Sequence, residues 1–249
     1  PNVDYLIIES VYGDRNHESP GMRRDLFRDA ILKAIKKNGT LLIPAFSLEK
    51  TQVLLYEMNN LVESGAIPNV PVFLDSPLAI KITDIYKRNS HVFNETVQKA
   101  MSAGDDILRF PKLIFTPSRM ESMRIAETPN PKIIIAGGGM STGGRILKHE
   151  QMYLGDPKNT ILFVGYQSAG SLGRQIEEGV RKIKIGNDQM TVRSEIIKIS
   201  GYSSHKDLDN LVSFVEDSAD TLKKVFVVMG EPKASLFLCQ RIKDYLGVE

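Results

Sequence analysis

The stretch EIIKISGYSSHKDLDNLVSFV, residues Glu195–Val215, combines an apolar strand, a polar turn and an amphipathic helix. Its isoleucines predict a strand that stops before Gly201, and Ser203 or Ser204 is suited to cap the helix that follows. Leucine and valine recur at helical spacing from Leu208 onward. The stretch is therefore one strand–turn–helix unit, and most of the chain repeats this pattern.

His205 is the residue of this stretch with the widest chemistry, and we expect it in the first turn of the helix. A helix N-terminus carries partial positive charge, which disfavours an imidazolium there. We therefore expect a neutral His205 that can take a proton, pass one on or touch a phosphate. A histidine that only caps or packs against the helix is the alternative, and the local sequence leaves both open.

Apolar runs alternate with amphipathic segments along the chain. The predicted strands are DYLIIES, TLLIPAFS, VPVFLDSP, LIFTPS, KIIIAGGGM, TILFVGYQ and KKVFVVMG, which begin at residues 4, 40, 70, 113, 132, 160 and 223. The segment around residues 186–188 predicts a hairpin turn. Continuous apolar strands between helices indicate an α/β fold with a mostly parallel sheet covered on both faces.

Composition limits the class of protein. The chain has 249 residues, 42% of them hydrophobic, which is enough for one large domain or two small ones. Its 32 basic and 30 acidic residues nearly cancel to +2, so overall charge gives no support for a nucleic-acid partner. The single cysteine, Cys239, allows no internal disulfide and suits a reducing compartment, so we expect a cytoplasmic location and a Cys239 that packs inside the last helix. No apolar run reaches membrane-spanning length, and we expect no membrane partner.

Serines follow three of the predicted strands at the edge where ligands of parallel sheets bind. Ser47, Ser76 and Ser141 each lie between a strand and a helix. Because the backbone N–H groups at a helix start attract anions, these positions predict phosphate contacts.

The run GGGMSTGGR, residues 137–145, is the strongest local signal. Glycines such as Gly138 and Gly139 let a backbone approach a phosphate closely, and Arg145 could hold it with two hydrogen bonds. A dinucleotide site would need a third glycine where Thr142 stands, so a nicotinamide cofactor is not expected. The alternative is a tightly packed turn without a ligand.

Two further basic residues follow glycine-rich turns. His149 lies one helical turn after Arg145 and could face the same ligand. Arg174 follows a turn with the glycine spacing of a phosphate-binding loop, but Ser171 and Leu172 replace the lysine and hydroxyl residue that a nucleotide triphosphatase needs. We therefore exclude that class and keep Arg174 as a phosphate contact.

Two acidic residues end predicted strands. Glu9 ends a strand expected to be buried, where an unpaired carboxylate is costly, so it either bonds nearby N–H groups or has a chemical role. Asp75 ends the third strand, and we expect it to cap the next helix, with a bond to a ligand hydroxyl as the alternative.

Taken together, these segments resemble the β-CASP branch of the metallo-β-lactamase superfamily, the RNA-cutting relatives of the cleavage and polyadenylation endonuclease and of ribonuclease J. The matching segments, in the family's order, are ESVYGDRNHE, LLIPAFSLEKTQ, VFLDSPLA, IIIAGGGMSTGGRILKHE, ILFVGYQSAGSLGR, SGYSSHKDL and VVMGE. The resemblance covers nearly all of the chain. It implies a β-CASP domain over residues 14–198, flanked by residues 1–13 and 199–249 from the carboxy-terminal part of a metallo-β-lactamase αββα sandwich.

The resemblance also implies roles for the candidate residues. Glu9 stands at the acidic position called motif A and His205 at the histidine of motif B, which in the family pair beside the metal centre. The histidine would help to protonate the leaving oxygen of an RNA phosphodiester. The complete protein would hold two zinc ions, whose bridging hydroxide attacks the phosphorus. The glycine-rich loops would hold the phosphates of RNA, single-stranded by expectation, together with Ser47, Ser76, Ser141, Arg145, His149 and Arg174.

Two departures from the family pattern qualify this expectation. The family's His-x-His-x-Asp-His metal motif is absent, and four scattered histidines cannot form two zinc sites. Met229 stands where RNA-cutting members have the metal-binding histidine of motif C, and a thioether is a poor zinc ligand and more often fills a core. We therefore expect this chain alone to bind no zinc and to cut nothing. A non-catalytic RNA- or phosphate-binding module, such as a pseudo-nuclease subunit, is the alternative, and a small-molecule hydrolase on the same scaffold is a third class.

The chain starts within a predicted strand, which suggests a piece of a longer protein whose amino-terminal metal-binding half is missing. The metallo-β-lactamase segments would then lack half of their sandwich and expose apolar faces. We expect that missing half, another chain or a second copy in a homodimer to cover them.

Overall fold

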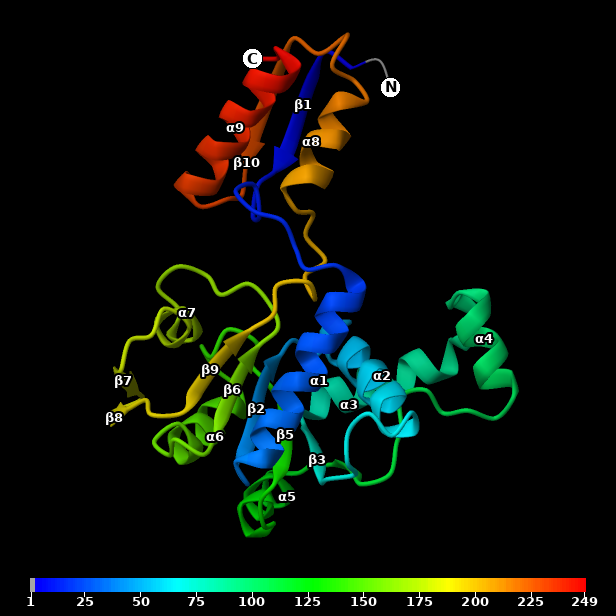
Figure 1. Cartoon of the computed structure of the whole chain (residues 1–249), viewed down its shortest axis with the longest axis vertical. Coiled ribbons are helices and arrows are strands. Elements are labelled where there is room, and N and C mark those ends of the chain that lie inside the picture. Colours follow the sequence, from blue (N-terminus) through cyan, green and yellow to red (C-terminus); the bar gives the residue numbers. More distant parts are fainter. Residues whose placement is uncertain (1–2) are drawn as a thin grey trace. The chain divides into compact units, whose positions relative to one another are not determined.

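A computed structural model of the chain describes residues 3–249. It contains two compact units (Figure 1). Unit 1 combines the residues up to Ser19 with Ser203–Glu249, and unit 2 consists of Pro20–Tyr202. Among the described residues, unit 1 has one sheet and one apolar core, whereas unit 2 has a six-stranded sheet, a small two-stranded sheet and two apolar cores.

Unit 2 is built on a six-stranded sheet in which every neighbouring pair of strands runs parallel. The strand order is β4-β3-β5-β2-β6-β9. The strands are β2 (Thr40–Ala45), β3 (Val72–Asp75), β4 (Leu113–Phe115), β5 (Lys132–Gly137), β6 (Thr160–Phe163) and β9 (Glu195–Lys198). The predicted α/β fold with a mostly parallel sheet is confirmed.

Helices cover both faces of this sheet because successive strand residues point to opposite sides. On β2, Leu41 and Ile43 join the core formed with α1 (Pro20–Lys36), α2 (Lys50–Glu63) and α3 (Pro77–Arg88). Leu42 faces the opposite core, which is formed with η2 (Ile125–Glu127), α6 (Ile146–Tyr153) and α7 (Leu172–Glu177). The other described helices of unit 2 are η1 (Ser90–Val92), α4 (Glu95–Ser102) and α5 (Arg119–Arg124). Strands β7 (Lys182–Ile185) and β8 (Asp188–Thr191) form an antiparallel hairpin, which confirms the turn predicted around residues 186–188.

The strand order determines where a ligand can bind. From β2 the chain passes through α2 to β3, on one side of β2, whereas from β5 it passes through α6 to β6, on the other side. Parallel sheets bind ligands at the carboxyl ends of the strands where the direction of winding changes. In unit 2 this point lies at the ends of β5 and β2, which carry the glycine-rich run and Ser47.

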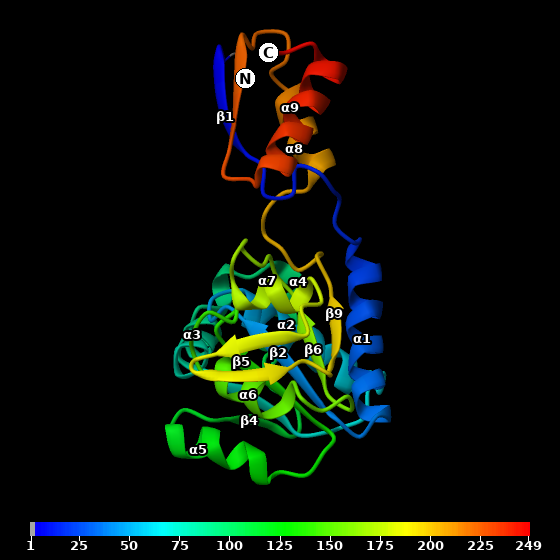
Figure 2. The same cartoon turned by 90° about the vertical axis from the view of Figure 1, so that its left-hand side faces the viewer.

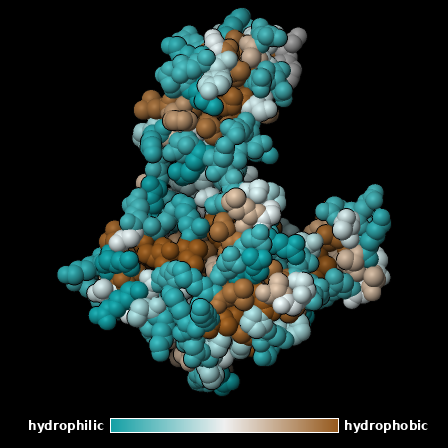
Figure 3. Space-filling view, viewed as in Figure 1, coloured by the Kyte–Doolittle hydropathy of each residue, from teal (hydrophilic) through white to brown (hydrophobic). Residues whose placement is uncertain are grey.

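Unit 1 pairs β1 (Tyr5–Glu9) with β10 (Lys224–Val228) in a two-stranded parallel sheet. Figure 2 shows α8 (Leu208–Glu216) and α9 (Pro232–Leu246) on the same side of this sheet, where both helices contribute to one apolar core. The other face carries Ile7, which is 72% exposed, together with exposed Tyr5, Phe226 and Val228. The expected burial of the first strand is thus wrong for one of its faces. Figure 3 shows apolar surface on both units.

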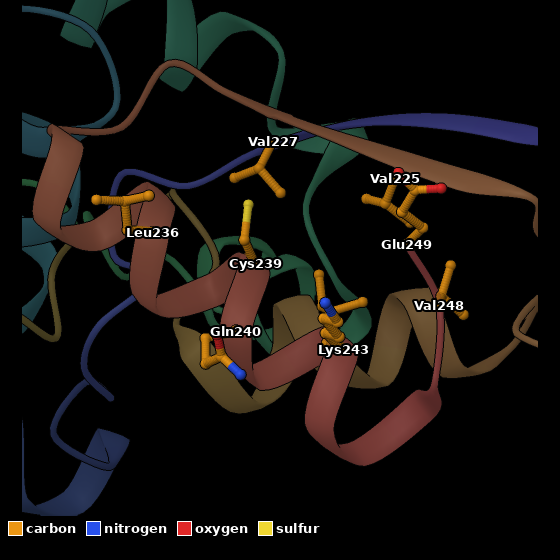
Figure 4. A pocket seen from close by; sticks show the side chains of 9 residues that line it. Val225, Val227, Leu236, Cys239, Gln240, Lys243, Val248 and Glu249 are labelled. Carbon is orange, nitrogen blue, oxygen red and sulfur yellow. The ribbon is translucent and has the colours of Figure 1, made fainter.

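A pocket of about 190 Å³ lies between β10 and α9 in unit 1 (Figure 4). Val225, Val227 and Leu236 line it, and the sulfur of Cys239 points toward Val227. Cys239 is exposed, so the expectation that it packs inside the last helix is wrong. Among residues 3–249, no helix has both the length and the apolar character needed to cross a membrane.

Candidate functional site

In unit 1, Glu9 and His205 lie side by side at the carboxyl end of β1. Oε1 of Glu9 is 3.1 Å from Nδ1 of His205 and also accepts a 3.3 Å hydrogen bond from the backbone of Lys206. Oε2 of Glu9 accepts a 3.0 Å bond from the backbone N–H of Val11. Both oxygens of the carboxylate are therefore engaged, and the imidazole is oriented through Nδ1.

The two segments that carry this pair are joined along their length. Tyr12 forms an isolated parallel bridge with Asp207, and the backbone N–H of Leu208 donates to the carbonyl of Arg15. Nε2 of His17 lies 3.0 Å from the carbonyl oxygen of His205. The backbone that carries His205 is thus attached to the loop that follows Glu9, which explains how residues so far apart in sequence meet.

The structure corrects the expected position of His205. Helix α8 starts at Leu208, and the side chain of Asp207 caps it by accepting from the N–H of Asn210. His205 precedes the cap and lies in a bend, so it is not in the first turn of the helix. Neither Ser203 nor Ser204 is the cap, because the helix starts at Leu208 and Asp207 is the residue directly before it.

Met229 follows β10 at the same end of this sheet, since β10 pairs Val228 with Glu9. Its side chain is 76% exposed, and its backbone has φ of 63°. The general expectation that a methionine after a valine run fills the core is therefore wrong here. The structure places a thioether, at a position accessible to solvent, at the end of the sheet that also carries Glu9.

In unit 2, buried Asp75 at the end of β3 organises a network of side chains. Its Oδ1 accepts from Nη1 of Arg145 at 2.6 Å and from the hydroxyl of Thr116 at 2.8 Å. Its Oδ2 accepts from the hydroxyl of Ser122 at 2.6 Å and lies 2.7 Å from Nε2 of His149. Burial raises the pKa of Asp75, but the hydrogen bonds from His149, Ser122, Arg145 and Thr116 outweigh it and hold the pKa at about 2.

This network uses two of the residues predicted to hold phosphate. The guanidinium of Arg145 also donates to the carbonyl oxygens of Thr116 and Pro117, the latter at 2.8 Å. Arg145 therefore links Asp75 to the backbone that follows β4. His149 is buried against Asp75. The cap of α3 is Ser76, so the expectation that Asp75 caps that helix is wrong. Arg145 and His149 are four residues apart, a spacing that places them on one helix face, but this spacing does not indicate Asp75 as their common partner.

Two of the predicted serines meet at the switch point of the sheet. The hydroxyls of Ser47 and Ser76 are 3.2 Å apart, although the residues lie on different loops. The backbone of Gly137 borders both, because a Cβ added there would lie 2.9 Å from Oγ of Ser76 and 3.9 Å from Oγ of Ser47. The ends of β2, β3 and β5 thus contribute to one small polar site.

The glycine-rich run folds back on itself beside this pair. Gly138 has φ of 118°, and a Cβ there would lie 2.0 Å from the carbonyl oxygen of Gly143. A Cβ at Gly144, where φ is 81°, would lie 2.3 Å from the carbonyl oxygen of Gly137. These glycines are required by the packing of the turn, which is the alternative that the sequence left open. A phosphate contact by Gly138 or Gly139 stays a prediction.

Ser141 and Arg174 are engaged within the protein. Ser141 is buried with φ of 55°, and its hydroxyl donates to Oε1 of buried Glu150. Burial raises the pKa of Glu150 to about 7, although the bond from Ser141 opposes that shift. Arg174 donates to Glu178 at 2.6 Å and to the carbonyl of Gln167 at 3.2 Å. Their roles as phosphate contacts stay predictions.

Sequence reasoning did not single out Lys50, Phe46 or Glu150. Lys50 begins α2 three residues after Ser47, and burial lowers the pKa of its ammonium to about 8, with Glu49 opposing and Arg23 adding to the shift. Phe46 is partly exposed next to Ser47. Phe46 and Lys50 lie in the family-like segment LLIPAFSLEKTQ, but no periodic pattern distinguishes them from packing residues.

Comparisons with known proteins agree with this architecture. The Beta-Casp domain family matches residues 51–176, and a Zn-dependent metallo-hydrolase RNA specificity domain matches residues 189–249. A ribonuclease of Thermus thermophilus is 31% identical over 96% of this chain and 54% of its own length. An RNase J-like protein of Methanocaldococcus jannaschii is 30% identical over 99% of this chain and 56% of its own length. The transcription termination factor FttA of Methanosarcina mazei is 29% identical over 100% of this chain and 40% of its own length. The chain thus spans about half the length of these curated relatives.

Proposed function

Because the chain belongs to the β-CASP family of metallo-β-lactamase-type nucleases, we propose that it supplies the proton-donating pair and an RNA-binding surface of a ribonuclease that hydrolyses phosphodiesters. The observation that carries the proposal is the 3.1 Å contact between Glu9 and His205. A carboxylate that orients an imidazole is a recurrent arrangement for general acid–base catalysis. The ribonuclease relatives supply the class of substrate.

Glu9 and His205 act through Nε2 of His205, the ring nitrogen that Glu9 does not contact. With Glu9 on Nδ1, Nε2 of His205 is the atom that gives a proton to the departing oxygen of the cleaved phosphodiester. Glu9 stabilises the positive charge that His205 carries before this transfer. A solvent proton then restores the imidazolium. Proton transfer of this kind contributes about 10²–10⁴-fold to a rate.

The polar site of unit 2 holds the RNA backbone in this proposal. The hydroxyls of Ser47 and Ser76 donate to phosphate oxygens, and Lys50 adds positive charge at the same edge of the sheet. An extended single strand is the form we propose, because unpaired bases can then reach the side chains beside these hydroxyls.

The indication of zinc comes from the family comparison, because the second matching domain is described as Zn-dependent. Among residues 3–249, no three or more histidine, cysteine, aspartate or glutamate side chains are grouped so that they could hold a metal ion. Both carboxylate oxygens of Glu9 are also already in hydrogen-bond contact with other groups. The described residues therefore do not fit the two zinc ions that we expect in the complete protein, and we assign no chemical step to a metal. We propose that such ions are held by residues outside this chain.

The test uses this chain and a longer protein in which it is joined to a metal-binding half. The longer protein is expected to cleave single-stranded RNA, and His205→Ala is expected to lower the rate by about 10²–10⁴-fold without lowering RNA affinity. The 249-residue chain is expected to bind RNA and to leave it intact. A longer protein with bound metal and no cleavage of RNA would contradict the proposal.

A non-catalytic RNA-binding subunit is the second candidate, and exposed Met229 favours it. If the natural protein is a degenerate nuclease, Met229→His in the longer protein should raise both its zinc content and its cleavage rate. If the longer protein cleaves RNA and Met229→His leaves that rate unchanged, the site works without a ligand at this position and the second candidate fails.

A further inference from the structure

Phe46 is an aromatic residue that the fold places in solvent at the ligand-binding edge of unit 2. It directly follows β2, whose residues are all buried, yet its own side chain is 43% exposed. Its carbonyl accepts from the backbone N–H of Thr51 at 3.3 Å and from the Thr51 hydroxyl at 2.8 Å. The backbone that carries the ring is therefore fixed by α2.

One side of the ring lies on the backbone of a neighbouring loop. A Cβ added to Gly139 would lie 3.0–3.1 Å from Cδ2, Cε2 and Cγ of Phe46, so only glycine leaves the ring this space. A Cβ added to Gly165, in the loop after β6, would lie 4.0 Å from Cε2. The loops after β5 and β6 thus support the ring, and the exposed part of the ring is the part that these loops leave uncovered.

The hydroxyl pair lies next to this ring. Ser47 is the next residue in the chain, and its hydroxyl is 3.2 Å from that of Ser76. Gly137, which borders both hydroxyls, is two residues before the Gly139 that supports the ring. Hydroxyl donors beside a supported aromatic ring match a nucleotide, whose phosphate and ribose accept hydrogen bonds and whose base has an apolar π-face.

We propose that Phe46 is a base-stacking subsite for single-stranded RNA, and that Ser47 and Ser76 bond the phosphate or ribose adjoining the stacked base. The inference rests on the proposed RNA-binding function and adds to it a specific contact with a base. Stacking on an aromatic side chain tolerates any base, so the subsite selects unpaired nucleotides rather than a sequence. Loss of such a contact corresponds to between about fivefold and about 150-fold in Kd.

The test measures binding of the 249-residue chain to a fluorescent 12-nucleotide RNA and to the same backbone without bases. Phe46→Ala is expected to weaken binding of the complete RNA by about 5–150-fold and to leave binding of the abasic strand unchanged. Phe214→Ala is the matched control, because Phe214 is 60% exposed on α8 in the other unit. Unfolding by urea checks that both variants keep the fold.

A second measurement places a reporter at the ring. The chain contains no tryptophan, so Phe46→Trp introduces a unique fluorophore that retains stacking. The complete RNA is expected to quench it and the abasic strand to leave it unquenched, whereas a tryptophan introduced by Phe214→Trp should respond to neither.

The outcomes separate the two proposals. If RNA binds and Phe46→Ala has no effect, or weakens the complete and abasic strands equally, the stacking subsite is overturned and RNA binding stands. An unquenched fluorophore in Phe46→Trp with RNA bound overturns it as well and favours a protein partner for the ring. If the unaltered chain binds neither strand, the proposed RNA-binding function falls together with the subsite.

Discussion

At the scale of single residues, Glu150 shows how the fold places a carboxyl group where its charge is unfavourable. It is buried at the start of the second turn of α6, and the one described bond to its side chain comes from Ser141. Its Oε2 has no hydrogen-bond partner among the described residues. A carboxyl group in such a place is favoured in its protonated form.

We predict that Glu150 makes stability fall as the pH rises. The pKa of Glu150 is raised to about 7 by burial, from the ordinary value of 4.5 that it has when unfolded. The stability that the protonated group contributes is therefore complete below pH 4.5 and lost as the pH rises through 7, by roughly 3 kcal/mol. Glu150→Gln should match the unaltered chain at pH 5 and exceed it at pH 8 in urea unfolding.

The control for this prediction is Glu63→Gln, because Glu63 is exposed near the end of α2. It should unfold at the same urea concentration as the unaltered chain at both pH values. A stability difference for Glu150→Gln that stays constant between pH 5 and 8 would contradict the raised pKa.

The sequence predicted a chemical role for several residues, but it did not predict which other residues they contact. Glu9 and His205 were recognised through a resemblance to a family, since nothing in the local patterns pairs two residues so far apart. The predicted position of His205 was wrong because α8 starts at Leu208 with Asp207 as its cap, three to four residues later than a cap at Ser203 or Ser204 would place it. Arg145, His149 and Ser141 were expected to face a ligand, and the structure gives each an internal partner that sequence spacing alone does not reveal.

At the scale of elements, Asp75 joins β3 to three other parts of unit 2. It bonds Arg145 and His149 of the α6 segment, Thr116 after β4 and Ser122 of α5. Removing one member of a buried charged network leaves its partners without compensation, which costs more than the bonds contributed.

We predict that Asp75→Asn lowers the free energy of unfolding by about 3–5 kcal/mol. Asp84→Asn is the control, because Asp84 is exposed on α3 and should change stability by less than about 0.5 kcal/mol. The unaltered chain should also lose stability as the pH falls from about 4 toward 2, since the pKa of Asp75 is held at about 2 and the carboxylate must remain ionised. Equal urea midpoints for the two variants would contradict this role of Asp75.

The elements themselves were largely predictable. Continuous apolar strands between amphipathic helices specify a parallel sheet, and every predicted strand and the hairpin are present. The strand order was not predictable from these patterns, because β5 pairs between β2 and β3 through contacts distant in sequence. That order is what brings Ser47, Ser76 and Gly137 together.

At the scale of the whole molecule, unit 1 has a two-stranded sheet of which its own described helices, α8 and α9, cover one face. Exposed Ile7 and Phe226 face each other in the register of β1 and β10. The sequence predicted this exposure from the resemblance to half a sandwich. What covers the face stays a prediction, as do the homodimer and the cytoplasmic location.

We predict that this face makes the isolated chain associate. Ile7→Lys should shift the chain toward monomer in sedimentation equilibrium at micromolar concentration, because a charge there opposes burial of the face. Leu236→Lys is the control, since Leu236 is exposed on α9. An unaltered chain that is monomeric at these concentrations would contradict the prediction.

The most direct test of the account concerns the proton that we assign to His205. In the longer protein, cleavage is compared for ordinary RNA and for RNA in which sulfur replaces the departing oxygen of the cleaved bond, because a thiolate leaves without a proton. We predict that His205→Ala slows cleavage of ordinary RNA by about 10²–10⁴-fold and slows cleavage of the sulfur-containing RNA very little. An equal loss on both substrates would contradict a proton-donating role for His205.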